Sequence, residues 1–189
     1  FTPQALDSLR QPMETGEVLI SRANHRAVYP ARFQLVAAMN PCRCGHALDP
    51  GFSCRRQPLE RCTAQYQARL SGPLLDRIDL QVAMQRLPAS ALACEAPEGE
   101  TSASVRSRVI AARERQLVRA GKPNALLGQA ELVRDCGLDP GDQRLLEASI
   151  DRMQMSARGV HRVLRVARTI ADLAASPTIR TLHLAEAIG

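Results

Sequence analysis

Four cysteines follow one another in the first third of the chain, at Cys42, Cys44, Cys54 and Cys62. Four thiolates within about 20 residues can close a tetrahedral zinc site. The first pair is spaced Cys-x-Cys rather than the commoner Cys-x-x-Cys, and His46 could replace one ligand. Redox-active or disulfide-linked thiols and unliganded cysteines are the alternatives. The spacing favours a structural zinc ion held by these four cysteines.

An asparagine stands directly before the cysteines, at the end of the apolar run Phe33–Met39. That run has little polar alternation, which is typical of a central strand buried on both faces of a parallel sheet. Ligands bind at the carboxyl ends of such strands, so Asn40 could orient a water or contact a phosphate. The alternative is a turn residue before Pro41, which the spacing alone favours.

An arginine follows the cysteines, at the head of the alternating run Ile78–Met84. Arg77 could reach an anionic group on a neighbouring subunit, because an arginine supplied in trans stabilises the charge that develops on a transferring phosphoryl group. The alternative is an ion pair with Asp76 or Asp79. The alternating run predicts a half-buried strand.

A basic face is predicted on the best helix of the chain, Ser156 to about Ala175. At about 100° per residue, its arginines lie opposite a continuous apolar stripe. Arg158 and Arg162 fall in the first two turns, where positive charge opposes the helix dipole. A bound anion would offset that cost, and a solvated basic face is the alternative. His161 and Arg165 lie on the same predicted face.

A hairpin is predicted from Glu17–Ile20 and Ala27–Tyr29, with a polar tip between the two strands. A protruding basic tip could touch a nucleic-acid backbone, and the alternative is an exposed polar turn. The tip residues with that chemistry are Arg22, Asn24, His25 and Arg26.

A phosphate-cradling loop is absent from the sequence. Such a loop needs Gly-x-x-x-x-Gly-Lys-Ser/Thr, and the only lysine lies in Gly121-Lys122-Pro123, with Gln116 where the first glycine should be. No apolar run ends in the paired acids that hold magnesium. This chain is therefore expected not to hydrolyse nucleotide alone.

The composition suits a small globular protein with one or two domains. The chain has 189 residues, is 45% hydrophobic and 3% aromatic, and carries a formal net charge of +6. A basic balance permits a nucleic-acid or nucleotide partner, and a solvated arginine-rich surface is the alternative. No apolar run approaches the roughly 20 residues that span a membrane, so we expect a cytoplasmic protein with no membrane partner. The isolated Cys94 and Cys136 are expected to be bystanders.

The order of these features predicts an α/β unit followed by an all-α unit. We expect residues 1–87 to form the α/β unit with the cysteine insert, 88–103 a linker and 104–189 a helical domain. The chain begins with Phe1 rather than Met, which suggests a piece of a longer protein.

The chain resembles the ComM/YifB proteins, the magnesium-chelatase-like branch of the AAA+ ATPases. Three stretches carry the resemblance: Arg22–Pro41 (ending Tyr-Pro-Ala-Arg-Phe-Gln-Leu-Val-Ala-Ala-Met-Asn-Pro), Leu70–Leu80 and Ser156–Leu173. The fold implied is the second half of an AAA+ P-loop α/β core, then a helical lid. The Walker A and B segments would lie before Phe1.

The resemblance also implies roles for individual residues. Asn40 would be sensor 1, Arg77 the arginine finger, and Arg158 the sensor 2 arginine, with Arg162 as second choice. ATP and Mg²⁺ would be the cofactors, and the parent protein would form an oligomeric ring, as a hexamer, that translocates DNA or drives branch migration. Porphyrin metallation is not implied. A zinc-stapled nucleic-acid-binding module and an assembly scaffold without motor activity remain the competing readings.

Overall fold

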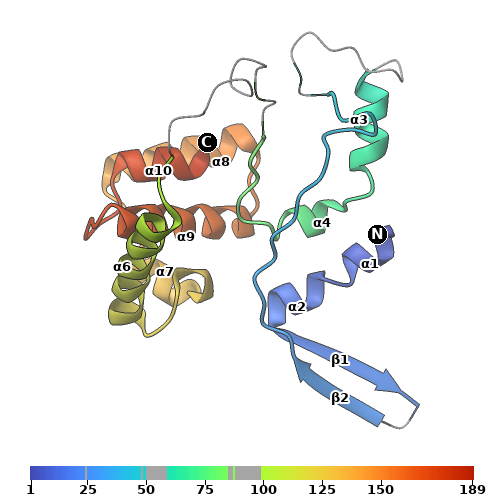
Figure 1. The fold of residues 1–189 in the computed structure, drawn as a ribbon. Helices are drawn as coiled ribbons and strands as arrows, with labels where there is room; N and C mark the ends of the chain where they lie inside the picture. Colours follow the sequence, from blue (N-terminus) through green and yellow to red (C-terminus); the bar gives the residue numbers. More distant parts are fainter. Residues whose placement is uncertain (24, 48, 50–58, 85–86, 88–98) are drawn as a thin grey trace. The chain divides into compact units, whose positions relative to one another are not determined.

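The structure, a computed structural model, describes residues 1–189 except 24, 48, 50–58, 85–86 and 88–98 (Figure 1). The chain divides into two compact units, Phe1–Ala93 and Cys94–Gly189. The predicted linker 88–103 falls largely outside the described residues, and its boundaries stay a prediction. The elements of the first unit are α1 (Pro3–Asp7), α2 (Arg10–Thr15), β1 (Glu17–Arg22), β2 (His25–Pro30), α3 (Leu59–Gln67) and α4 (Gly72–Leu75).

The first unit begins with two short helices, α1 and α2. The Thr2 hydroxyl accepts a hydrogen bond from the backbone N–H of Ala5 at 3.3 Å, which caps α1. Gly16 ends α2 with φ of 71°, a left-handed conformation in which a Cβ atom would be strained. The chain then turns directly into β1.

The predicted hairpin is confirmed, with strands slightly longer than expected. β1 and β2 pair antiparallel, with Glu17 opposite Pro30 and Arg22 opposite His25. Figure 1 shows the two strands extending beyond α1 and α2 toward the turn. Ala23, in that turn, has φ of 47°, so a non-glycine residue occupies a left-handed position at the tip.

The two further predicted strands, Phe33–Met39 and Ile78–Met84, are not strands in this structure. Among the described residues, β1 and β2 form the whole sheet. The first run was predicted to be buried on both faces, yet Val36 is 85% exposed, and Val82 of the second run is 76% exposed. A strand needs a neighbour for its backbone N–H and C=O groups, and a buried run needs layers above and below it. No described segment supplies either, so this structure does not show the predicted half of an AAA+ sheet.

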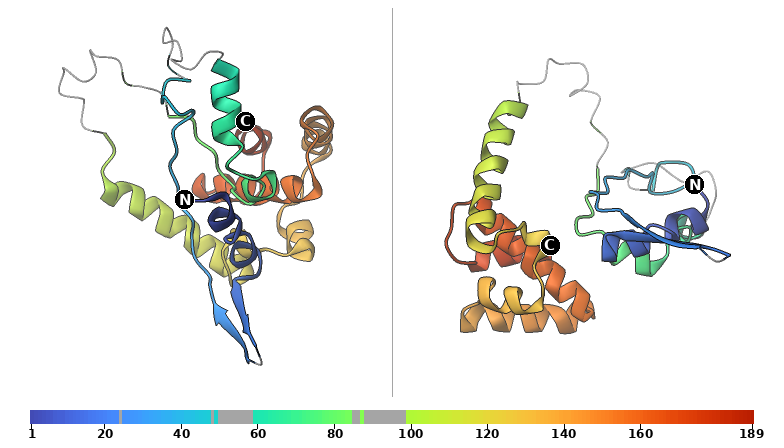
Figure 2. Two further views of the ribbon diagram at one scale, coloured as in Figure 1. Left: turned by 90° about the vertical axis from the view of Figure 1, so that its right-hand side faces the viewer. Right: turned by 90° about the horizontal axis from the view of Figure 1, so that it is seen from below.

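The second unit is helical throughout its described residues. Its elements are α6 (Ser102–Ala120), the 3₁₀ turn η1 (Asn124–Leu126), α7 (Gln129–Asp135), α8 (Pro140–Met153), α9 (Ala157–Leu173) and α10 (Thr181–Ile188). Helix α9 packs against α6, η1, α7 and α10, and α8 packs against α10. The right-hand view of Figure 2 shows these helices as one packed group.

The apolar stripe predicted for the helix from Ser156 is confirmed, and side-chain caps begin two helices of this unit. The Asp139 carboxylate accepts from the N–H groups of Gly141 and Asp142 at the start of α8, and Ser156 caps α9. The last helix begins at Thr181, and Arg180 holds its N-cap position. The stripe of α9 contributes three buried residues to the core, which consists of Leu127, Leu132, Cys136, Leu146, Val163, Ala167, Ala171, Ile179 and Leu184.

The chain as described is thus mixed α/β, mostly helical, with one small two-stranded sheet. Burial is concentrated in the second unit, where a single aliphatic core joins α7, α8, α9 and α10. A search of the described helices for one long and apolar enough to cross a bilayer found none.

Candidate functional site

Three of the four predicted metal-ligating cysteines come together in the first unit. The Sγ atoms of Cys42, Cys44 and Cys62 all lie within 4.8 Å of one another. Cys42 and Cys44 come from the loop after Asn40, and Cys62 comes from the first turns of α3. Cys42 is fully buried and Cys62 is 5% exposed. The fourth predicted ligand, Cys54, lies outside the described residues, so three thiols define this candidate centre.

A glycine turn brings the first two thiols together. The Gly45 N–H donates to the Cys42 carbonyl at 3.1 Å, and Gly45 has φ of 83°. The turn leaves the Sγ atoms of Cys42 and Cys44 3.1 Å apart. His46, the predicted substitute ligand, follows this turn and places Nδ1 2.9 Å from Oδ2 of Asp49.

Cys136 behaves as the bystander that the sequence predicts. It is buried among aliphatic side chains of the second unit, and this burial raises the pKa of its thiol to about 11. A thiol with so high a pKa stays protonated and is a poor metal ligand. The other isolated cysteine, Cys94, lies outside the described residues.

Arg77 is held by partners that the sequence did not reveal. Its Nη1 donates to the Pro73 carbonyl at 2.5 Å, and its Nη2 is paired with a carboxylate oxygen of Glu14, on α2. The ion pair that the structure shows for Arg77 is thus with Glu14, whereas the sequence suggested Asp76 or Asp79 as the alternative partner. The Arg77 side chain is 13% exposed, whereas that of Glu14 is 45% exposed. The guanidinium is thus anchored on its own turn and faces a partner that solvent can reach.

Asn40 lies on the exposed chain between β2 and the cysteines. It does not end a strand here, because Phe33–Met39 forms none. The Cys42 thiol, two residues later, is fully buried, so the chain passes from an exposed to a buried position within three residues. This geometry leaves the catalytic role that the resemblance implies for Asn40 as a prediction.

The basic residues of α9 divide into two groups. Arg158 lies exposed in the first turn and Arg162 is half-buried one turn later. Arg165, predicted on the same solvated face, instead donates from Nε and Nη2 to the Leu127 carbonyl, at 3.2 and 2.7 Å. Arg165 therefore ties α9 to the chain after η1, and Arg158 and Arg162 are the candidates for anion binding.

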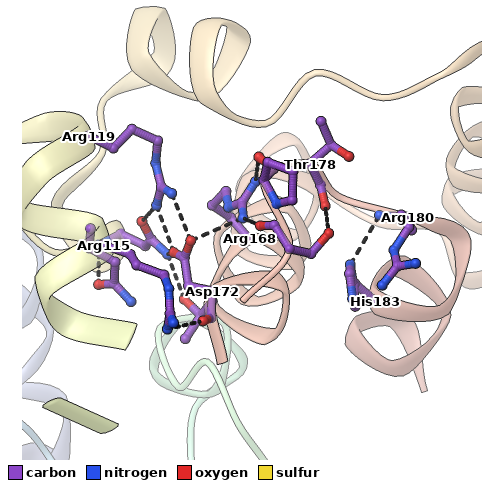
Figure 3. A network of polar contacts seen from close by, with 12 residues as sticks. Arg115, Arg119, Arg168, Asp172, Thr178, Arg180 and His183 are labelled. Carbon is purple, nitrogen blue, oxygen red and sulfur yellow. Dashed lines mark hydrogen bonds and ion pairs between the residues drawn. The ribbon is translucent and has the colours of Figure 1, made fainter. Parts of the chain in front are cut away.

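A buried polar network, which sequence reasoning missed, fixes α9 within the second unit (Figure 3). Its centre is the carboxylate of Asp172, which is 1% exposed. Both carboxylate oxygens accept from Arg119 of α6 at 2.7 Å, Oδ1 also accepts from Arg168 at 3.0 Å, and Oδ2 accepts from Asn124 at 2.9 Å. The i, i+4 spacing of Arg168 and Asp172 was a visible signal for part of this network.

The second arginine of the network closes the turn after α9. Arg168 is 1% exposed and donates to the carbonyls of Ser176 and Pro177, at 2.7 and 2.9 Å. Burial alone would raise the pKa of Asp172, but hydrogen bonds from Arg119 and Asn124 and the arginine charges outweigh it, so the pKa lies below its ordinary value. Asp172 is therefore ionised at neutral pH.

A buried histidine lies beyond this turn, as Figure 3 shows. The Nδ1 atom of His183 accepts a hydrogen bond from the Arg180 N–H at 3.1 Å, and the side chain is fully buried. Burial and the nearby charges of Arg180 and Arg168 lower the pKa of His183. The ring is therefore neutral at pH 7.

The hairpin tip presents its basic residues to solvent. Arg22, His25 and Arg26 are exposed, and Asn24, the fourth predicted contact, lies outside the described residues. Arg22 and His25 are a cross-strand pair, and Arg26 lies opposite Ser21. Two arginines and a histidine therefore lie close together at the end of a two-stranded ribbon.

Two family models together match nearly all of the chain. The model for magnesium chelatase, subunit ChlI, matches residues 1–92, and that for the ChlI C-terminal region matches residues 99–189. The chain belongs to the magnesium chelatase subunit ChlI family. The magnesium-chelatase-like resemblance inferred from the sequence is thereby confirmed.

Curated proteins from several bacteria are similar to the chain. Competence protein ComM of Haemophilus influenzae is 48% identical over 189 residues, which is all of this chain and 36% of that protein. The uncharacterized protein YifB of Escherichia coli K12 is 43% identical over 188 residues, again 36% of its length. An uncharacterized protein of Mycobacterium tuberculosis H37Rv is 43% identical over 175 residues, 90% of this chain and 33% of that protein. The chain thus spans about a third of the length of these curated relatives.

The Asp172 network predicts that two acid-to-amide substitutions lower the free energy of unfolding by very different amounts. Asp172→Asn should lower the free energy of unfolding by about 3 kcal/mol, because it leaves the buried charge of Arg168 and the partly buried charge of Arg119 without their carboxylate. Glu131→Gln is the matched control: its pair with Lys122 is half-exposed and screened by solvent, so the substitution should cost clearly less. Urea unfolding of both variants gives the two values, and equal costs would contradict the central role of Asp172.

Acidification should destabilise the second unit through His183. A histidine whose pKa is lowered in the folded state stabilises the fold above its ordinary pKa of about 6.5, and this contribution is lost as the pH falls toward the lowered value. His183→Gln removes that titration, so its unfolding free energy should fall less steeply below pH 6.5 than that of the natural chain. Identical slopes for His183→Gln and the natural chain would rule out this account.

Proposed function

We propose that this chain is the part of an AAA+-type ATPase that supplies residues acting on ATP bound by Mg²⁺ and a P-loop elsewhere in a longer protein. The observation that carries the proposal is the match of both halves of the chain to the ChlI family, with Arg77 anchored next to an exposed carboxylate. No P-loop signature occurs in this sequence, so in this proposal the P-loop is supplied by another part of the longer protein.

Arg77 is the residue best suited to act on a neighbour's nucleotide. The Pro73 carbonyl anchors Nη1, and Nε is buried without a partner among the described residues, so the guanidinium has capacity for a further acceptor. A γ-phosphate carries more charge than the carboxylate of Glu14 and could replace it as partner of Nη2. An arginine supplied in this way stabilises the charge of the transferring phosphoryl group.

The exposed apolar runs support a longer protein as the functional form. Phe33, Val36 and Met39 of the first run and Leu80, Val82 and Met84 of the second are between 48% and 85% exposed. Contiguous exposed apolar chain is unusual in a soluble protein and indicates a missing partner surface. We infer that both runs become strands of a sheet completed by further chain, which would bring Asn40 to a strand end as sensor 1.

Helix α9 would provide the remaining residues that contact the nucleotide. Its first two turns carry Arg158 and Arg162, and the Asp172 network fixes the far end of the helix against α6. Movement of the second unit as a lid would carry these arginines toward or away from the phosphates. We assign the sensor 2 role to Arg158, with Arg162 as second choice, in an oligomeric ring of identical subunits.

DNA is the proposed polymer on which the motor acts. The relative from Haemophilus influenzae is named a competence protein. The basic tip of the hairpin is the surface in this chain best suited to touch a phosphate backbone, because Arg22, His25 and Arg26 are all exposed on a protruding ribbon. The same observation favours the second candidate, a nucleic-acid-binding module without motor activity.

An arginine-finger role predicts a specific kinetic defect in the full-length protein. Arg77→Ala should lower ATP turnover by about 10³-fold while ATP binding, measured by titration with a fluorescent nucleotide, stays within about twofold. Glu14→Gln is the matched control, because it breaks the same ion pair but keeps the arginine. Loss of activity in both variants would indicate a structural pair, and full activity of Arg77→Ala would disprove the assignment.

A hairpin contact with DNA predicts a change in salt dependence. Each of Arg22→Ala and Arg26→Ala should weaken binding to duplex DNA regardless of base sequence and reduce the slope of log K against log[salt] by about 1. Arg106→Ala, an exposed arginine on α6, serves as the matched charge control and should leave the slope unchanged. Equal slopes for all three variants would exclude the tip as the DNA contact, whereas DNA binding without any ATPase activity would favour the second candidate.

A further inference from the structure

Two of the three convergent thiols of the first unit, Cys42 and Cys62, are buried, and no aliphatic core among the described residues of this unit accounts for their burial. Cys42 and Cys62 form a small cluster of their own, against which Cys44 and Ala47 pack. Cys136 shows the contrasting case: its thiol is one member of a core made of leucine, valine, alanine and isoleucine. Thiols that contact mainly one another gain little from the hydrophobic effect, so a bond between them is the stronger explanation of their convergence.

A disulfide accounts for these positions poorly. The Sγ atoms of Cys42 and Cys44 are 3.1 Å apart, beyond the roughly 2.05 Å of an S–S bond. No disulfide joins any of the cysteines that the structure describes. A disulfide would also use two thiols and leave the third without a reason to be buried there. A ligand that uses all three sulfurs fits better.

A metal ion of tetrahedral preference fits this set. Zinc binds thiolate sulfur at about 2.3 Å, which places two sulfurs of a tetrahedron roughly 3.8 Å apart. The three Sγ atoms, all within 4.8 Å of one another, need only small side-chain rotations to reach that spacing. An all-sulfur donor set is soft, which selects zinc or iron–sulfur clusters over magnesium or calcium. The predicted fourth ligand remains Cys54, outside the described residues.

We propose that Cys42, Cys44 and Cys62 hold a structural zinc ion that joins the loop after Pro41 to helix α3. The two segments meet at the thiols, and Gly45 provides the turn that aims two sulfurs at the third. Zinc sites built from cysteine thiolates are typically structural, so we expect the ion to stabilise the fold and to take no part in chemistry. This inference is independent of the ATPase proposal.

The experiment is metal analysis of the whole chain, purified without chelator. We expect about one zinc per chain, because a structural site is saturated once folded. Cys62→Ser and Cys44→Ser should each lose stoichiometric zinc, whereas Cys136→Ala, a matched buried cysteine, should keep it. Cys62→His restores a ligand atom and should recover metal, which separates loss of a ligand from loss of folding.

Cobalt substitution provides a second readout that does not depend on how well a variant folds. Cobalt in the natural chain should give thiolate charge-transfer absorption and the intense visible bands of tetrahedral coordination, and Cys62→His should shift both. Substoichiometric zinc in the natural chain, or zinc content unchanged in both serine variants, would overturn the proposal. So would bound iron in place of zinc, or an intact mass that reveals a disulfide among these cysteines.

Discussion

The carboxylate of Asp172 is the group on which the second unit depends. It joins α6 through Arg119, η1 through Asn124 and the turn after α9 through Arg168, all at 2.7–3.0 Å. A buried ionised carboxylate is tolerated only where donors surround it, and here the donors come from three separate segments. The position of α9, and with it that of Arg158 in the first turn, follows from this one set of hydrogen bonds. The aliphatic core supplies most of the burial but would tolerate small slides of one helix along another.

The first unit is organised differently. Among its described residues only Pro12, Cys42, Cys62 and Leu74 are buried, so no aliphatic core holds its elements together. Single polar contacts do so instead, such as the Ser71 hydroxyl donating to Asp7 at 2.5 Å and the pair between Arg77 and Glu14. Each exposed polar contact contributes little to stability. The proposed metal ion, by joining two segments, would therefore stabilise this unit more than it would stabilise the second unit.

These two kinds of organisation agree with the role proposed for the chain. A rigid helical unit can carry arginines as a body, whereas a unit with exposed apolar runs requires further chain to complete it. The family match spans both units, and the relatives are about three times as long as the chain. Arg77 connects two features of the first unit, because its partner Glu14 lies on α2, the helix that leads directly into the hairpin.

Local pattern by itself determined the helix that follows Ser156 and the hairpin, because a helix cap and a tight turn act through neighbours a few residues away. The family was also readable, since its motifs are contiguous. Tertiary structure alone decided which polar groups meet: Glu14 for Arg77, Leu127 for Arg165, and Asp172 for three donors. It also left Phe33–Met39 unpaired, although its apolar pattern predicted a strand. The physical reason is the same throughout: hydrogen bonds, ion pairs and sheet ladders need partners distant in sequence, and periodicity reports what a segment can bury but not what will cover it.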